Sequence, residues 1–187
     1  MKSRKPTKQV FEFTLVLEGI QRITRELEDD LFEAGCDDAT LSARSGRVFL
    51  AFARSAATLR EAVVSAIHAV QAAKIQATVL RVDSCGLVTQ ADIARKINRS
   101  RQQVHQYVSG LRGPGGFPPP ACNISDGVPL WNWSEVAQWM CQHDIIQPAM
   151  LLEAQELAAV NCVLELNYQR QVAPELTNAI LQALGTP

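Results

Sequence analysis

The sequence lacks the features of a membrane or secreted protein. No run of about eighteen apolar residues occurs in its 187 residues, so no transmembrane helix is expected. A signal peptide is not predicted either, because residues 11–17 alternate apolar and polar side chains and no small-residue cleavage site follows. We therefore expect a cytoplasmic protein that does not contact the membrane.

Clustered metal ligands and catalytic motifs are also missing. No Cys-x-x-Cys pair and no glycine-rich loop of the P-loop or dinucleotide-binding type is present. Cys141 and His143 are neighbours, but two residues are too few to predict a metal site, and His68 is expected to pack in the core. The scattered cysteines, expected to be reduced thiols, are Cys36, Cys85, Cys122, Cys141 and Cys162. No enzyme activity, cofactor or metal is predicted.

Charge is low in total but unevenly distributed. The formal net charge is −1, yet residues 1–9 carry +4 and residues 84–120 carry +4, whereas residues 10–83 carry −3 and residues 121–187 carry −6. Neutralising phosphates with basic side chains releases counterions, so the central segment has the charge of a nucleic-acid site. The basic tail at 1–9 is expected to be a solubilising terminus, with a minor-groove arm as the alternative.

Residues 89–109 have the spacing of two short helices that meet at a tight turn. Thr89 is suited to cap the first helix and Ser100 the second, because a hydroxyl oxygen accepts a hydrogen bond from a free backbone amide. Asn98 fits a turn position that requires positive φ. The apolar residues at helical intervals are Ile93, Ala94, Ile97, Val104, Tyr107 and Val108. The pattern predicts a helix-turn-helix.

The outer face of the second helix is polar. Arginine and glutamine pair bidentately with guanine and adenine edges in the major groove, and the N-terminal part of this helix reads the bases. Arg99 takes a turn position that is usually apolar and is expected to face a phosphate. The outward residues of the helix are Arg101, Gln102, Gln103, His105 and Gln106. The alternative is an amphipathic helical pair whose polar face is only solvated.

The segment that follows adds a loop and an aromatic helix. Residues 110–120 are rich in glycine and proline and cannot continue a helix. The pattern Trp-x-x-Ser-Glu-Val-x-x-Trp, from Trp131 to Trp139, predicts a helix capped by Ser134 with Val136, Trp139 and Met140 inward. Trp131, Trp133 and Trp139 are expected to be core residues and not a base-stacking platform.

This order of elements resembles the winged helix-turn-helix of excisionase-like and MerR-like regulators over about residues 86–142. The resemblance implies that the aromatic helix packs beneath the loop and that Arg112 to Gly116 form a wing beside double-stranded DNA. The three consecutive prolines and the insert at 121–127 depart from the family pattern. The candidate DNA-contacting residues are Thr89, Gln90, Arg99, Ser100, Arg101, Gln102, Gln103, His105, Gln106, Arg112, Gly115 and Gly116.

Residues 10–84 are expected to form a separate α+β domain. Their patterns predict the order strand, helix, strand, strand, helix, strand, which is that of a ferredoxin-like (βαββαβ) sandwich. The expected elements are a strand over 11–17, a helix from Ile20 to Gly35 with Ile23, Leu27 and Leu31 inward, a hairpin of 39–43 and 48–53 through Ser45-Gly46, a helix opened by a capping box at Thr58 to Glu61 and ending near Ala73, and a strand over 75–82.

The C-terminal segment, residues 148–187, has a helical pattern. Pro174 suits the first turn of a last helix that ends near Leu184 and Gly185. The wide apolar face comprises Leu151, Leu152, Leu157, Val160, Val163, Leu164 and Leu166. This face is expected to cover the first domain or a second copy of the chain. A homodimer through this segment or through the N-terminal sheet is favoured.

The sequence thus predicts an α+β protein with a ferredoxin-like domain at 10–84, a winged helix-turn-helix at 86–143 and C-terminal helices at 148–187. Its predicted function is that of a sequence-specific DNA-binding transcriptional regulator, whose N-terminal domain makes partner, effector or dimer contacts. The alternative is a protein-interaction module, antitoxin-like or an accessory factor, in which DNA binding is secondary or absent.

Overall fold

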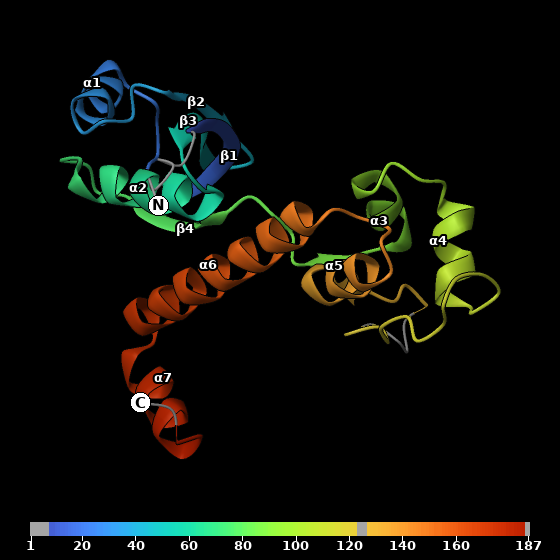
Figure 1. Cartoon of the computed structure of the whole chain (residues 1–187). Coiled ribbons are helices and arrows are strands. Elements are labelled where there is room, and N and C mark those ends of the chain that lie inside the picture. Colours follow the sequence, from blue (N-terminus) through green and yellow to red (C-terminus); the bar gives the residue numbers. More distant parts are fainter. Residues whose placement is uncertain (1–7, 123–126, 186–187) are drawn as a thin grey trace, which may run out of the picture. The chain divides into compact units, whose positions relative to one another are not determined.

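The computed structural model describes residues 8–122 and 127–185, and shows an α+β protein with a four-stranded antiparallel sheet and seven helices in that part of the chain (Figure 1). It divides into unit 1, Met1–Asp83 with Ala159–Pro187, and unit 2, Ser84–Ala158. Most of the basic tail at 1–9 and part of the insert at 121–127 lie outside the described residues.

Unit 1 is built on a sheet with the strand order β2-β3-β1-β4, in which every neighbouring pair is antiparallel. Phe13, Leu15 and Leu17 are buried, which confirms the predicted first strand and its inward face, and Val16 between them is buried as well. Ser45 (φ 52°) and Gly46 (φ 76°) form the predicted two-residue turn of the hairpin. The strands are β1 (Gln9–Glu18), β2 (Ala39–Arg44), β3 (Arg47–Ala56) and β4 (Thr78–Val82), so the last is three residues shorter at its start than expected.

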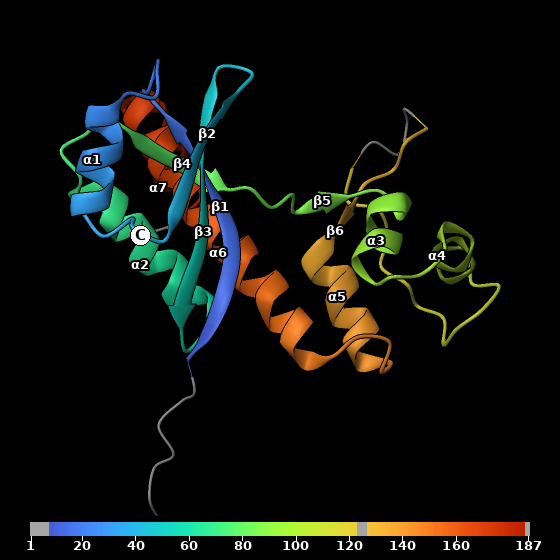
Figure 2. The same cartoon turned by 90° about the horizontal axis from the view of Figure 1, so that it is seen from above.

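Helices α1 (Arg25–Glu33) and α2 (Leu59–Ala72) lie on one face of this sheet (Figure 2). The predicted start of the first helix at Ile20 is wrong, because the side chain of Thr24 accepts from the amide of Leu27 and caps the helix there. The predicted cap at Thr58 is confirmed, since its oxygen lies 3.1 Å from the amide nitrogen of Glu61.

His68 corrects a second expectation. The sequence placed it in the core, but its side chain is exposed on the outer side of α2. The inward positions of that helix are filled by Ala62, Val63, Ala66, Ile67 and Val70. These residues form the inward face of the helix. His68 lies at a different angle around the helix axis, so it faces solvent.

The last two helices are α6 (Pro148–Val172) and α7 (Pro174–Ala183), and α6 belongs to unit 1 from Ala159 onward. Within unit 1, Leu164 of α6 is buried, whereas Val163 is exposed. The predicted apolar face is therefore covered only in part. Pro174 begins α7 and Leu184 is its C-cap, as expected, but no residue of α7 is buried.

Unit 2 contains two short strands and three helices in the described part, followed by the start of α6. Its core joins Val88, Ile93, Val104, Trp131 and Met140. All three tryptophans are buried, which confirms their predicted place in the core. The elements are β5 (Leu87–Val88), which pairs with β6 (Trp131–Asn132), α3 (Gln90–Lys96), α4 (Arg101–Val108) and α5 (Trp133–Gln142).

The N-cap of α5 differs from the sequence prediction. Asn132 caps the helix, not Ser134, because the Asn132 Oδ1 accepts from the amide nitrogen of Ser134 at 3.0 Å and from its hydroxyl at 2.8 Å. Both residue types cap helices well, so the sequence alone does not distinguish between them. The buried face of the helix, which includes Val136, Trp139 and Met140, is as predicted.

Candidate nucleic-acid interface

A complete capping box fixes the start of α3. The Thr89 oxygen accepts from the amide nitrogen of Asp92 at 3.2 Å, and the Asp92 carboxylate accepts from the amide nitrogen of Thr89 at 2.9 Å. Asp92 is also paired with Arg95. Hydrogen bonds from Thr89 and Arg95 lower the pKa of Asp92 to about 2. The Thr89 hydroxyl is therefore already engaged within the protein, where it donates to Asp92 at 2.7 Å.

The turn between α3 and α4 depends on Asn98, whose φ is 51°. After it, the amide nitrogen of Arg99 returns to the carbonyl of Ala94 at 2.9 Å, and the Ser100 oxygen caps α4 by accepting from Gln103 at 3.1 Å. Ile93 of α3 and Val104 of α4 are fully buried in one core. The two helices, their caps and the turn lie where the sequence predicts them.

The predicted outward residues of α4 fall into two groups. Arg101, Gln102 and His105 are exposed, as expected. Gln103 is half-buried, and its Nε2 donates to the Tyr107 hydroxyl at 2.8 Å, so this side chain is turned toward its own helix. Gln106 and, on α3, Gln90 are also half-buried, whereas the capping residue Ser100 is exposed.

Three arginines are among the residues that line one shallow, open depression of about 590 Å³ between α3 and the start of α4. They are Arg95, Arg99 and Arg101, all of which are exposed. Asp92 is the acidic residue of this lining, and its charge is partly balanced by the ion pair with Arg95. Arg95 was not singled out from the sequence, although its place on the first predicted helix, close to the turn at Asn98, was a usable signal.

Lys96 is a second basic residue that sequence reasoning did not place. Its Nζ lies 5.2 Å from the centre of the Trp133 ring, in a cation–π contact. The charge of Lys96 is therefore held near α5. It contributes to the positive potential of unit 2 and is not a group of the depression.

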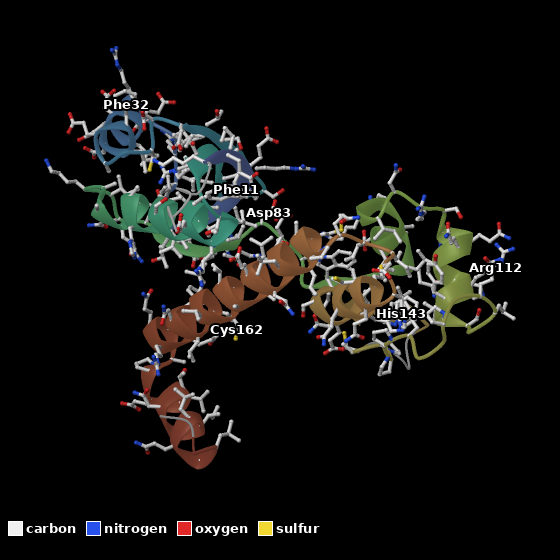
Figure 3. All side chains as sticks on the ribbon, viewed as in Figure 1. Phe11, Phe32, Asp83, Arg112, His143 and Cys162 are labelled. Carbon is white, nitrogen blue, oxygen red and sulfur yellow. The ribbon has the colours of Figure 1, made fainter. Side chains whose placement is uncertain are left out.

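The loop after α4 is held against α5. Gly115 accepts from the Trp139 Nε1 through its carbonyl at 2.9 Å, and the Phe117 ring meets the Trp139 ring edge-on at 4.9 Å between centroids. Gly113 has φ 93°, and a Cβ there would lie 3.0 Å from the Tyr107 ring, so only glycine fits without a shift. Arg112 is exposed in this loop (Figure 3). Gly116 is exposed as well.

The segment expected to form the wing, Arg112 to Gly116, is therefore a packed loop without strand pairing in the described structure. Antiparallel pairing occurs farther along the chain, where Cys122 bridges Leu130 in line with the β5–β6 pair. The part of the chain between these two bridged residues includes most of the insert at 121–127, of which residues 123–126 lie outside the described residues.

Cys141 is half-buried and His143 is exposed at the end of α5. His143 stacks edge-on against Trp139 at 4.8 Å between ring centroids. In the described ranges, no group of three histidine, cysteine, aspartate or glutamate side chains is placed to hold a metal ion. The helices of the same ranges also include none with the length and apolar character needed to cross a membrane.

Comparison of the chain with protein-family models, with curated proteins and with solved structures found no match.

Proposed function

We propose that this chain is a cytoplasmic, sequence-specific DNA-binding transcriptional regulator, in which unit 2 is a winged helix-turn-helix and α4 enters the major groove of double-stranded DNA. The observation that carries the proposal is the gathering of Arg95, Arg99 and Arg101 around the start of α4, beside the exposed Gln102 and His105. Unit 1 is a ferredoxin-like sandwich in this proposal, supported by its strand order β2-β3-β1-β4.

The chemistry of the residues divides between the two tasks of a DNA-binding surface. Phosphate contacts set position and affinity, and contacts to base edges set specificity. Arg95 and Arg99 flank the depression and are suited to phosphates, whereas Arg101 and Gln102, in the first turn of α4, are placed to read base edges. Gln103 has no direct base contact in this proposal because it is bonded to Tyr107.

The test begins with selection of bound fragments from genomic DNA, followed by affinity measurements on the selected site. Arg101→Ala with Gln102→Ala is expected to weaken binding by at least 10-fold, since a bidentate base contact contributes about 1–3 kcal/mol. The matched control is Arg170→Ala with Gln171→Ala, the same pair of residue types exposed on α6. Equal affinity of the two double variants would contradict the proposal.

Salt dependence separates phosphate from base contacts. Arg99→Ala is expected to weaken binding to all sequences alike and to reduce the slope of log K against log salt by about 1. Arg101→Ala with Gln102→Ala is expected to reduce discrimination between the selected site and unrelated DNA.

A second function is favoured by one observation. Leu176 and Ile180 of α7 and its C-cap Leu184 recur every four residues and are 63%, 48% and 73% exposed. An apolar stripe of this kind fits a protein-interaction module in which DNA binding is secondary or absent. Absence of salt-dependent DNA binding, together with a stoichiometric protein partner lost on Ile180→Ser, would favour this second function.

A further inference from the structure

The two edges of the sheet in unit 1 differ in how they are covered. At the β4 edge, Asn161 of α6 accepts from the amide nitrogen of Val82 at 2.7 Å and donates to its carbonyl at 3.1 Å, which imitates the pairing of a neighbouring strand. At the opposite edge, β2 pairs with β3 on one side, and no further strand follows in the described sheet. Thr40, Ser42 and Ala43 of β2 are exposed.

Strand β2 has none of the features that usually protect an edge. Proline, bulges and central charges prevent an edge strand from pairing with another chain. The sequence Ala39–Arg44 contains no proline, its register with β3 is regular, and its single charge, Arg44, lies at the end. By contrast, the pairing of β4 with β1 has a register shift.

The pairing with β3 also decides which backbone groups of β2 face outward. The amide nitrogen of Ala53 donates to the carbonyl of Asp38 at 3.0 Å, so Asp38 belongs to a hydrogen-bonded position. Because such positions alternate in an antiparallel pair, Thr40 and Ser42 bond to β3, whereas the backbone groups of Leu41 and Ala43 point to the free edge.

We propose that β2 pairs with β2 of a second copy of this chain, antiparallel and centred on Leu41, to form one continuous sheet across a homodimer. In this register Leu41 faces its own copy and Ala39 faces Ala43. Thr40 then lies opposite Ser42, and Asp38 lies opposite Arg44. The pairs within the strand are compatible in size and bring no like charges together, so the edge is complementary to itself. The Asp38 carboxylate keeps its own partner, since it accepts from Arg54 at 2.7 and 2.8 Å.

The hydrogen bonds follow from the same register. The N–H and C=O groups of Leu41 bond to those of Leu41 in the other copy, and the Ala43 N–H donates to the Ala39 carbonyl across the axis. The Ala39 N–H is already bonded to the carbonyl of Cys36 at 3.1 Å, so it is satisfied without the dimer. The interface lies wholly in unit 1 and does not depend on DNA binding.

Two adjacent proline substitutions test the edge. Ala43→Pro removes an outward N–H, one bond for each copy, and is expected to weaken the dimer about 30-fold, from about 1 kcal/mol for each bond. Its far-UV circular dichroism is expected to be unchanged, since proline is tolerated at an outward edge position. Ser42→Pro, the matched control, removes a donor to β3 and is expected to lose sheet structure. Mass is measured by light scattering on the full chain without DNA.

A disulfide experiment tests the register and does not rely on the proline variants. Thr40→Cys and Ser42→Cys are prepared separately in a chain that carries Cys85→Ser and Cys162→Ser, which removes the two exposed thiols. Opposed residues at a non-hydrogen-bonded position have Cα atoms about 4.5 Å apart, within disulfide range. Oxidation of the mixture is expected to give a linked dimer, and oxidation of either variant alone is not.

Three results would overturn the proposal. They are a monomeric mass of the unaltered chain at tens of micromolar, an absence of cross-linking in the mixture, and a dimer that survives Ala43→Pro but dissociates on Ile180→Ser of the exposed α7 stripe. The last result would assign the contact to α7. Because mass and cross-linking are measured without DNA, a failure of the dimer proposal can be distinguished from a failure of the DNA-binding proposal.

Discussion

Replacing Trp139 by phenylalanine is expected to destabilise unit 2 because this residue joins α5 to the loop after α4. Its side chain is 6% exposed, its Nε1 donates to the Gly115 carbonyl, and its ring contacts the Phe117 and Tyr107 rings at centroid distances of 4.9 and 5.7 Å. Phenylalanine keeps an aromatic ring at this position but has no N–H and is smaller. The variant therefore removes the hydrogen bond and part of the ring packing.

The magnitude follows from these two losses. A hydrogen bond of this kind contributes about 1 kcal/mol, and an aromatic pair contributes about 0.5–1.5 kcal/mol beyond its buried area. A loss of about 2 kcal/mol corresponds to a fall in Tm of roughly 8–16 °C for a unit of this length.

Tryptophan emission provides an assay that reports on unit 2. Trp131, Trp133 and Trp139 all lie in Ser84–Ala158, so emission follows this unit, whereas far-UV circular dichroism follows both units. The variant keeps two of the three tryptophans as reporters. The control is Phe52→Leu in unit 1, which removes a ring stacked on Phe13 at 5.3 Å between centroids. It is expected to shift the dichroism transition and to leave the emission midpoint in place.

The reasoning is refuted if Trp139→Phe leaves the midpoint of the emission transition unchanged. That result would mean that the loop after α4 is not held by the Trp139 contacts. The expected result is a lower emission midpoint for Trp139→Phe and an unchanged emission midpoint for the Phe52→Leu control.

Two further predictions concern α3 and the turn that follows it. Asn98→Ala is expected to cost about 1–2 kcal/mol, because φ is 51° there, while Asn98→Gly costs much less; equal urea midpoints in tryptophan emission would contradict this. Asp92 has a pKa of about 2 in the folded chain, below the unfolded value of about 3.9, so its stabilisation is present above that unfolded value and lost as pH falls toward 2. Asp92→Asn is expected to cost about 1 kcal/mol at pH 7 and to be nearly neutral at pH 2, as urea titrations at the two pH values will show; an equal cost at both would contradict the assignment.

Local sequence patterns were enough to predict the two helices α3 and α4 of unit 2 and the turn between them. Thr89 and Ser100 cap α3 and α4, and Asn98 takes the positive φ of the turn, as predicted. These features succeed because they involve groups within four residues of each other, whose geometry is set by short-range hydrogen bonds and φ/ψ preferences. The same locality explains the hairpin turn at Ser45 and Gly46.

The prediction from local sequence patterns failed where two neighbouring positions fitted the pattern equally well. Ile20 and Ile23 continue the apolar spacing of α1 toward its N-terminus, but Thr24 begins the helix after them. Asn132 and Ser134 both cap helices, and the structure uses Asn132. His68 was placed in the core from its apolar neighbours, yet its own angular position on α2 points outward. In the first two cases a shift of two to five positions along the chain changes the outcome, and in the third the angle around the helix axis decides it.

The candidate site was only partly accessible from the sequence. Arg101, Gln102 and His105 are exposed as predicted, because the helical phase of α4 follows from its buried Val104. Gln103 is instead bonded to Tyr107, and Arg95 joins Arg99 and Arg101 around the depression. These outcomes depend on rotamers and on the crossing of two helices, which a linear pattern does not contain.

The sequence by itself determined the local elements of this protein: the caps, the two tight turns, the aromatic core of unit 2 and the uneven distribution of charge. Only the tertiary structure decided which sheet edges and helical faces remain uncovered. It brings Asn161 to the backbone of Val82, 79 residues away, and leaves β2 at the open edge of the sheet. The physical reason is that coverage of an edge or a helical face depends on contacts between distant segments, and these are set by packing and not by neighbouring residues.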